Sequence, residues 1–264
     1  MVLTDPYEFG RKNMEQLLSE LDIAFDPFLR KSYALVVPEV HPSLIARGTN
    51  SLVFSLPPVA EDENTIYLVG KTFKYTERRT FPSLVPKGEL HLVGKNTGLF
   101  AGGFGLEMTL HWLEEMEIEK QGVEVPRIEE YHIRIDKGTV PLYIYFTITR
   151  DLRENGKYEV GDAAAHLILH PQRFKKGIEL RETYYRVCDY ILEECKARGL
   201  VIHPAGHGTI DDPLPAISQM FLVQYDREGT AKLIVGDLNH VVIHHKDYIF
   251  GNIPNFLQTE GSAN

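Results

Sequence analysis

Short apolar runs separated by polar turns dominate the first half of the chain. Five of them are apolar throughout or alternate between apolar and polar residues, namely residues 34–37, 51–56, 66–71, 125–135 and 141–148. Proline, glycine and acidic residues separate the first three. Runs of this length bounded by turn residues are typical of β-strands. This half of the chain therefore predicts an antiparallel sheet.

Apolar residues at intervals of three or four predict helices. Such spacing occurs in residues 6–21, 106–119, 160–169 and 179–198. The first of these segments also has a helix-start signal, because Asp5 can act as N-cap and Pro6 suits the first helical position.

Two largely apolar runs nearer the C-terminus predict a β-hairpin. Residues 220–223 and 231–235 flank the turn 226–229, which reads Asp-Arg-Glu-Gly. Gln219 precedes the first run and Asp237 follows the second. Polar groups at the ends of rigid strands are well placed to do chemistry, so both are candidate functional residues.

Bulk composition is that of a globular protein. The chain has 264 residues, 43% hydrophobic and 25% charged, which is ample for a large core. Its formal charge of −9 argues against general nucleic-acid binding. Without a signal peptide or an apolar run long enough to cross a bilayer, no membrane association and a cytoplasmic location are expected. Cys188 and Cys195 lie too far apart on one predicted helix to form a disulfide and are expected to be buried thiols.

Lys71 lies in a predicted strand between Val69 and Phe73. Because side chains alternate along a strand, it is expected to point inward with those apolar neighbours. An ammonium group placed there needs an anionic partner. The candidate partners on the helix at 106–119 are Glu107, Glu114 and Glu115. A register in which Lys71 faces the surface is the alternative.

Two glycine-containing turns could bind an anion. The turn 47–51 reads Arg-Gly-Thr-Asn-Ser, and its backbone N–H groups at Gly48 and Thr49 could contact a phosphate. A plain hairpin turn is the alternative there. Four glycines within residues 98–105 precede a predicted helix and could cradle an anion, with a flexible linker as the alternative.

From residue 46 to residue 240, the elements follow one order: glycine turn, strand, strand with lysine, helix with glutamates, two strands, long helix, polar loop, hairpin and aspartate. This order resembles the protein-kinase-like fold, including its aminoglycoside-phosphotransferase and lipid-kinase branches. Val69-Gly-Lys71 resembles the Val-Ala-Ile-Lys strand, whose lysine holds nucleotide phosphates and pairs with a helix glutamate. The resemblance implies that the nucleotide is bound by Lys71, Glu107, Gly48 and Thr49, with Glu114 or Glu115 as the alternatives to Glu107.

Three further segments support the resemblance. Residues 200–203 (Leu-Val-Ile-His) resemble the entry to the His-Arg-Asp catalytic loop. Residues 219–222 (Gln-Met-Phe-Leu) resemble the segment whose Asn binds a second metal ion. Residues 233–239 (Leu-Ile-Val-Gly-Asp-Leu-Asn) resemble the Asp-Phe-Gly strand, whose Asp binds Mg²⁺. The resemblance therefore implies a magnesium site at Gln219 and Asp237.

The sequence departs from the family pattern at the catalytic base. That position falls on Ala205, which cannot accept a proton from a substrate hydroxyl. The loop is also longer than the family norm, so the candidates for this role are His207, Asp211 and Asp212. The chain after Asp237 is too short for the helices that complete a protein-kinase C-lobe, which favours a small-molecule substrate over a peptide.

We therefore expect an α+β, two-lobed kinase-like fold. Its parts are an N-terminal helical segment (1–30), a β-rich N-lobe with one helix (31–150) and a truncated helical C-lobe with a β-hairpin (151–264). The expected function is binding of ATP or ADP with Mg²⁺ and phosphate transfer to a small molecule, with weak or no turnover. No oligomeric state is predicted.

Two alternatives belong to other functional classes. One is a metal-dependent hydrolase, with ligands drawn from His203, His207, Asp211, Asp212, Asp237, His240, His244 and His245. The other is a non-catalytic interaction protein that uses the helix at 6–21 and the irregular polar segment 77–98.

Overall fold

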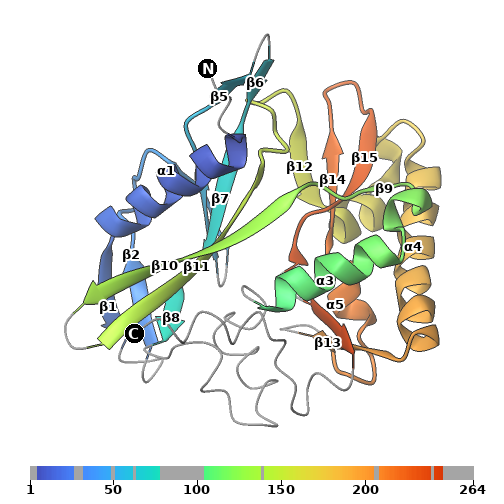
Figure 1. Ribbon diagram of the computed structural model, residues 1–264. Coiled ribbons are helices and arrows are strands. Elements are labelled where there is room, and N and C mark those ends of the chain that lie inside the picture. The colour runs from blue at the N-terminus through green and yellow to red at the C-terminus, as the bar shows by residue number, and fades with distance from the viewer. Residues whose placement is uncertain are drawn as a thin grey trace.

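The computed structural model describes residues 5–26, 32–48, 51–61, 64–77, 104–137, 140–204, 208–238 and 241–245. The protein is a mixed α+β structure with several antiparallel sheets and few helices, as the sequence predicts (Figure 1). In these ranges, no helix combines the length and the apolar character needed to cross a membrane.

A five-stranded antiparallel sheet forms the first half of the structure. In chain order its strands are β3 (Leu44–Arg47), β4 (Ser51–Ser55), β7 (Leu68–Phe73), β10 (Ile128–Lys137) and β11 (Val140–Arg150). Their spatial order is β10-β11-β7-β4-β3, so β7, which carries Lys71, is central. The shorter strands nearby are β1 (Asp22–Asp26), β2 (Ser32–Val36), β5 (Val59–Glu61), β6 (Asn64–Ile66) and β8 (Tyr75–Glu77).

Helix α1 (Pro6–Glu20) packs on one face of this sheet. Its start is capped as predicted, because the Asp5 carboxylate accepts a hydrogen bond from the Tyr7 amide at 3.0 Å. Met14 is fully buried above Gly70, where an added Cβ would lie 2.4 Å from the Met14 sulfur. Because adjacent side chains of a strand point to opposite faces, this packing directs Lys71 to the face away from α1.

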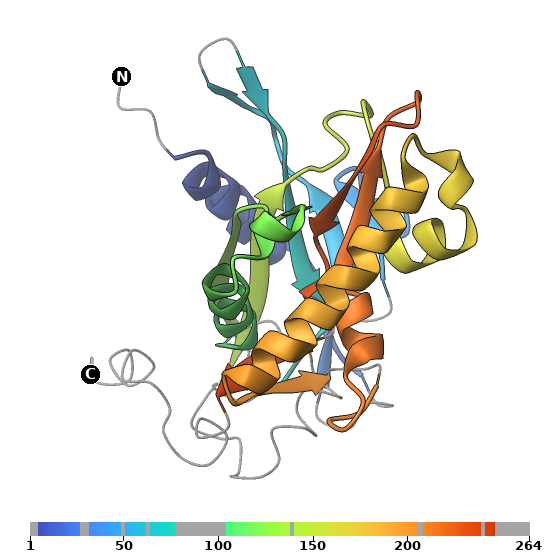
Figure 2. The same cartoon turned by 90° about the vertical axis from the view of Figure 1, so that its right-hand side faces the viewer.

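A second hydrophobic core joins the remaining helices, a four-stranded sheet that contains the hairpin, and a two-stranded sheet. The strands are β9 (Val123–Glu124), β12 (Glu159–Asp162), β13 (Leu200–Pro204), β14 (Phe221–Tyr225), β15 (Ala231–Val235) and β16 (Val241–His245). The helices are α3 (Phe104–Glu115), α4 (Gly177–Ala197) and α5 (Leu214–Ser218). Short helical turns lie at Ile118–Gln121, Ala164–Ile168 and Pro171–Arg173. The long helix α4 runs along one side of this half (Figure 2).

Helix α3 belongs to this second core. Leu106, Leu113 and Met116 are buried among its residues. The Thr109 hydroxyl donates to the Val241 carbonyl at 3.4 Å and accepts from the Ile243 amide at 3.0 Å. These bonds fasten α3 to β16 and bring its first turn, at Leu106, beside the sheet face that carries Lys71.

The structure confirms most of the elements that the sequence predicts, including α1, α3, α4, the hairpin β14–β15 and five predicted strands. The prediction of a helix over residues 160–169 is wrong for its first part. Val160 and its neighbours form β12, which pairs antiparallel with β14, so tertiary pairing overrides the local helical spacing there. The segment 77–98 lies outside the described residues beyond residue 77.

The packing of α1 on the sheet predicts that Gly70 tolerates no large side chain. Gly70→Val would push against fully buried Met14, and we expect it to lower the free energy of unfolding by about 1–3 kcal/mol in urea melts. Met14→Ala should make room for the new side chain, so the double variant should be less destabilised than the two single variants combined. An unchanged midpoint for Gly70→Val would contradict this packing.

Cys188 and Cys195 are buried on α4 and form no disulfide, as predicted. Burial raises the pKa of both thiols to about 12. The thiolate is the reactive form of cysteine, and a raised pKa leaves almost none of it at pH 8. We therefore expect iodoacetamide to label the native protein at least about a hundredfold more slowly than the urea-unfolded protein. Rapid labelling of the native protein would contradict the burial of these thiols.

Candidate functional site

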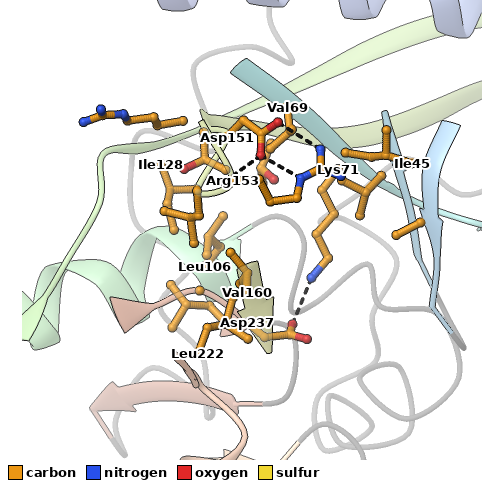
Figure 3. Close-up of a pocket in the computed structure, with 18 residues that line it drawn as sticks. Ile45, Val69, Lys71, Leu106, Ile128, Asp151, Arg153, Val160, Leu222 and Asp237 are labelled. Atoms are coloured by element: carbon orange, nitrogen blue, oxygen red, sulfur yellow. Dashed lines mark hydrogen bonds and ion pairs between the residues drawn. The ribbon is translucent and has the colours of Figure 1, made fainter. Parts of the chain in front are cut away.

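A cavity of about 310 Å³ lies between the five-stranded sheet and the hairpin end. The sheet supplies one wall, with Val53 from β4, Lys71 from β7 and Thr147 from β11. Leu106 of α3 and Leu222 of β14 also line the cavity (Figure 3). Its volume is in the range of small-molecule sites.

Lys71 and Asp237 meet across this cavity. The Lys71 Nζ lies 2.9 Å from Asp237 Oδ1, and the two side chains are 21% and 32% exposed (Figure 3). Residues separated by 166 positions are thus joined by one ion pair. This contact confirms the inward register predicted for Lys71, and the anionic partner is on the hairpin.

Strand register explains the position of Lys71. It pairs with Val53 on one side and with Thr147 on the other, so the three residues form a row across the sheet. All three line the cavity. Strand β7 is hydrogen-bonded to β4 on one side and to β11 on the other. The ammonium group of Lys71 therefore projects from the rigid centre of the sheet.

The backbone of the hairpin end holds Asp237 in place. The carbonyl of Met220 accepts the amides of Gly236 at 2.9 Å and of Asp237 at 3.1 Å. These bonds continue the β14–β15 register, whose last ladder pair joins Phe221 to Val235. The other predicted metal ligand, Gln219, ends helix α5, where its backbone amide donates to the Ala216 carbonyl at 3.2 Å, and it does not line the cavity.

The opposite end of the cavity is formed by the turn after β11, which sequence analysis did not identify as a site. Arg153 donates to Asp151 from Nε to Oδ1 and from a terminal nitrogen to Oδ2, both at 2.9 Å. Both residues line the cavity, together with Arg150. With Lys71, three cationic and two anionic side chains surround the cavity, although the chain has a formal charge of −9. The only sequence signal was the polar segment 149–156, which contains the predicted boundary between the N-lobe (31–150) and the C-lobe (151–264).

The other predicted site residues lie in several places. Gly48 is exposed, and its amide donates to the Ser51 carbonyl at 2.9 Å within the turn between β3 and β4. Asp211 and Asp212 are exposed on a turn outside the cavity lining. Thr49 and His207 lie outside the described residues, as does the side chain of Glu107. The predicted roles of these residues stay predictions.

The helix glutamates that are described do not reach Lys71. Glu114 and Glu115 are exposed on the last turn of α3. They lie eight or nine positions beyond Leu106, the α3 residue that lines the cavity, which corresponds to about 12 Å along a helix.

The metal-dependent hydrolase alternative requires several metal ligands close together. Among the described residues, no group of three or more His, Cys, Asp or Glu side chains could hold a metal ion. His203 and His244 do approach each other, with ring centroids 6.2 Å apart, on the paired strands β13 and β16. Burial lowers the pKa of His244, which favours its neutral form. The alternative of a metal-dependent hydrolase therefore gains no support from these ranges.

Comparisons of the chain with models of protein families, with curated proteins and with solved structures gave no match.

The ion pair across the cavity predicts an energetic coupling between Lys71 and Asp237. In a double-mutant cycle of Lys71→Met and Asp237→Asn, urea melts without ligand should give a coupling energy of about 1 kcal/mol, because the pair is partly buried. Added salt should reduce this energy by screening the charges. Strict additivity of the two substitutions at low salt would show that the side chains do not interact.

Proposed function

We propose that the cavity binds a purine nucleotide with Mg²⁺ in a kinase-like site, and that the protein is a phosphotransferase acting on a small molecule, with weak or no turnover. ATP or ADP is the nucleotide that the resemblance implies. The observation that carries the proposal is the 2.9 Å contact of Lys71 with Asp237 in one cavity. These are the two residues to which the resemblance assigns phosphate and metal binding.

The arrangement of elements supports the proposal. Lys71 is on the third strand of the five-stranded sheet in chain order, which is where kinases carry the phosphate-binding lysine. One hydrophobic core contains this sheet and a second contains the hairpin and α4. The cavity is lined from both, by Lys71 and Val53 on one side and by Leu222 and Asp237 on the other. We therefore propose a two-lobed kinase-like arrangement with this cavity between the lobes.

The residues present fit the chemistry of phosphate binding. Lys71 carries a positive charge that would neutralise phosphate oxygens, and its strand restricts where that charge can move. Asp237 offers a carboxylate to the cavity, a hard ligand of the kind that Mg²⁺ prefers. Gln219 does not line the cavity, and its role as a second metal ligand stays a prediction. A bound Mg²⁺ would supply further charge neutralisation between neighbouring phosphates. In the ligand-free protein, Lys71 and Asp237 neutralise each other instead.

The proposal of weak or absent turnover rests on position 205. The resemblance places the catalytic base there, and Ala205 has no group that could take a proton from a substrate hydroxyl. Asp211 and Asp212, the described candidates for a substitute base, do not line the cavity. Nucleotide binding is thus the part of the function that the geometry supports best.

Nucleotide binding can be tested by differential scanning fluorimetry with ADP or GDP and Mg²⁺. At about a hundred times its Kd, a ligand should stabilise the wild-type protein by about 2.7 kcal/mol. Lys71→Met and Asp237→Asn should each remove most of that stabilisation, because the first loses the phosphate contact and the second a metal ligand. Chelating the Mg²⁺ with EDTA should reduce the wild-type shift.

The matched control is another strand lysine in an ion pair. Lys232 of β15 lies 2.5 Å from Glu124 and is outside the cavity lining. Lys232→Met and Glu124→Gln should keep the full nucleotide-dependent shift. The proposal fails if the wild-type protein shows no shift, or if Lys71→Met and Asp237→Asn respond to nucleotide as the controls do.

A further inference from the structure

The turn at residues 151–153 fixes a carboxylate at the end of the cavity remote from Asp237. Asp151 is 13% exposed, and its Oδ1 accepts the Arg153 amide at 3.0 Å. This bond within the turn holds the carboxylate in one orientation. The Arg153 guanidinium then approaches the carboxylate with two parallel N–H donors (Figure 3). Asp151 is therefore pre-oriented to accept a planar pair of donors.

Most backbone hydrogen-bonding groups of this turn already have partners and are not available to a nucleobase. The carbonyl of Asp151 accepts the Glu154 amide, the carbonyl of Leu152 accepts the Gln224 side chain, and the Asp151 amide donates to Tyr67. Among the described residues, the Leu152 amide donates no hydrogen bond to a backbone carbonyl. Leu152 lines the cavity beside Asp151. The turn thus offers one amide donor next to a carboxylate that accepts two hydrogen bonds from a guanidinium, besides the one from the Arg153 amide.

A guanine edge complements this set of groups. Guanine presents one acceptor, O6, beside two donors, N1–H and the 2-amino group. The two donors form a planar fork like that of a guanidinium, so they can replace Arg153 on Asp151, while O6 can accept from the Leu152 amide. Adenine presents one amino donor beside a ring acceptor, so it can replace only one of the two guanidinium hydrogen bonds, and its ring nitrogen would face a carboxylate oxygen of Asp151 acceptor to acceptor. Buried polar groups left without partners are what makes such a site selective.

Arg153 has space to leave the carboxylate. Its side chain is 39% exposed. A second cavity of about 370 Å³ shares Asp151 and Arg153 with the first and is also lined by Tyr67 and Asn155. The guanidinium can therefore move into solvent or into this neighbouring space while the Arg153 amide keeps its bond to Asp151.

We propose that Asp151 is the base-reading residue of the site and selects guanine over adenine, with Arg153 occupying the base position in the ligand-free protein. This proposal rests on the proposed nucleotide-binding function and narrows it to a guanine nucleotide, in place of the ATP or ADP that the resemblance implies.

The first test compares GDP, ADP and IDP, each with Mg²⁺, by isothermal titration calorimetry on the wild-type protein. GDP should bind at least about tenfold more tightly than ADP, because a hydrogen bond to a charged group carries about that factor. IDP lacks the 2-amino group and should also bind more weakly than GDP. Equal or tighter binding of ADP would overturn the base assignment while leaving nucleotide binding intact. Absence of binding by all three would overturn both proposals.

The second test uses a substitution at Asp151 that should change the preferred nucleobase from guanine to xanthine. Asp151→Asn replaces a carboxylate oxygen by an amide donor, so GDP should lose about tenfold or more in affinity. XDP, which has a carbonyl in place of the 2-amino group, should then bind more tightly than GDP. An Asp151→Asn variant that still prefers GDP over XDP would show that Asp151 does not read the base.

Two further variants separate base reading from a structural role. Asp226 holds a similar turn in the hairpin, where its Oδ1 accepts the Glu228 amide at 2.9 Å, and Asp226→Asn should leave the base preference unchanged. Arg153→Ala removes the group that competes for Asp151 and should raise the affinity for GDP more than that for ADP. If Asp151→Asn and Arg153→Ala only lower the melting temperature and weaken GDP, ADP and XDP equally, the pair is structural and the proposal fails.

Discussion

One ion pair joins the two halves of this protein at the site. Lys71 lies at the centre of the five-stranded sheet and Asp237 at the end of a hairpin in the second core, and their side chains meet at 2.9 Å. Each charge is held by rigid backbone. Two neighbouring strands pair with the strand of Lys71, and the amides of Gly236 and Asp237 both donate hydrogen bonds to the Met220 carbonyl. Without a ligand, the ammonium group of Lys71 and the carboxylate of Asp237 neutralise each other. A ligand that brings both an anion for Lys71 and a cation for Asp237 can separate them. A nucleotide with Mg²⁺ has that composition.

The packing of the sheet makes this geometry possible. On one face, α1 covers Gly70 with Met14, and on the other face Lys71 lines the cavity. A larger residue at position 70 would push the helix away from the central strand. The α3 helix is seated differently, since Thr109 fastens it to β16 and its apolar residues join the second core. The cavity is therefore lined by residues from both halves of the protein, and its charged residues belong to elements far apart in the chain.

The sequence predicted the strands, the hairpin and the inward direction of Lys71, because side-chain alternation and polar residues at strand ends are local properties. The position of Asp237 directly after a buried strand was also readable from the sequence, whereas its contact with Lys71 depends on the tertiary structure and its function stays a prediction. The turn at Asp151 and Arg153 was missed, since its role arises only from a cavity that the sequence does not show. Residues 160–162 were assigned to a helix because their pairing with β14 is a long-range interaction that no local pattern encodes.

The measurement that tests this account most directly is a crystal structure of the protein with a non-hydrolysable purine nucleotide and Mg²⁺. The account predicts that Lys71 contacts the phosphates, that Asp237 contacts the metal ion and that their direct contact is lost. A nucleotide bound elsewhere, with the Lys71–Asp237 ion pair unchanged, would contradict it.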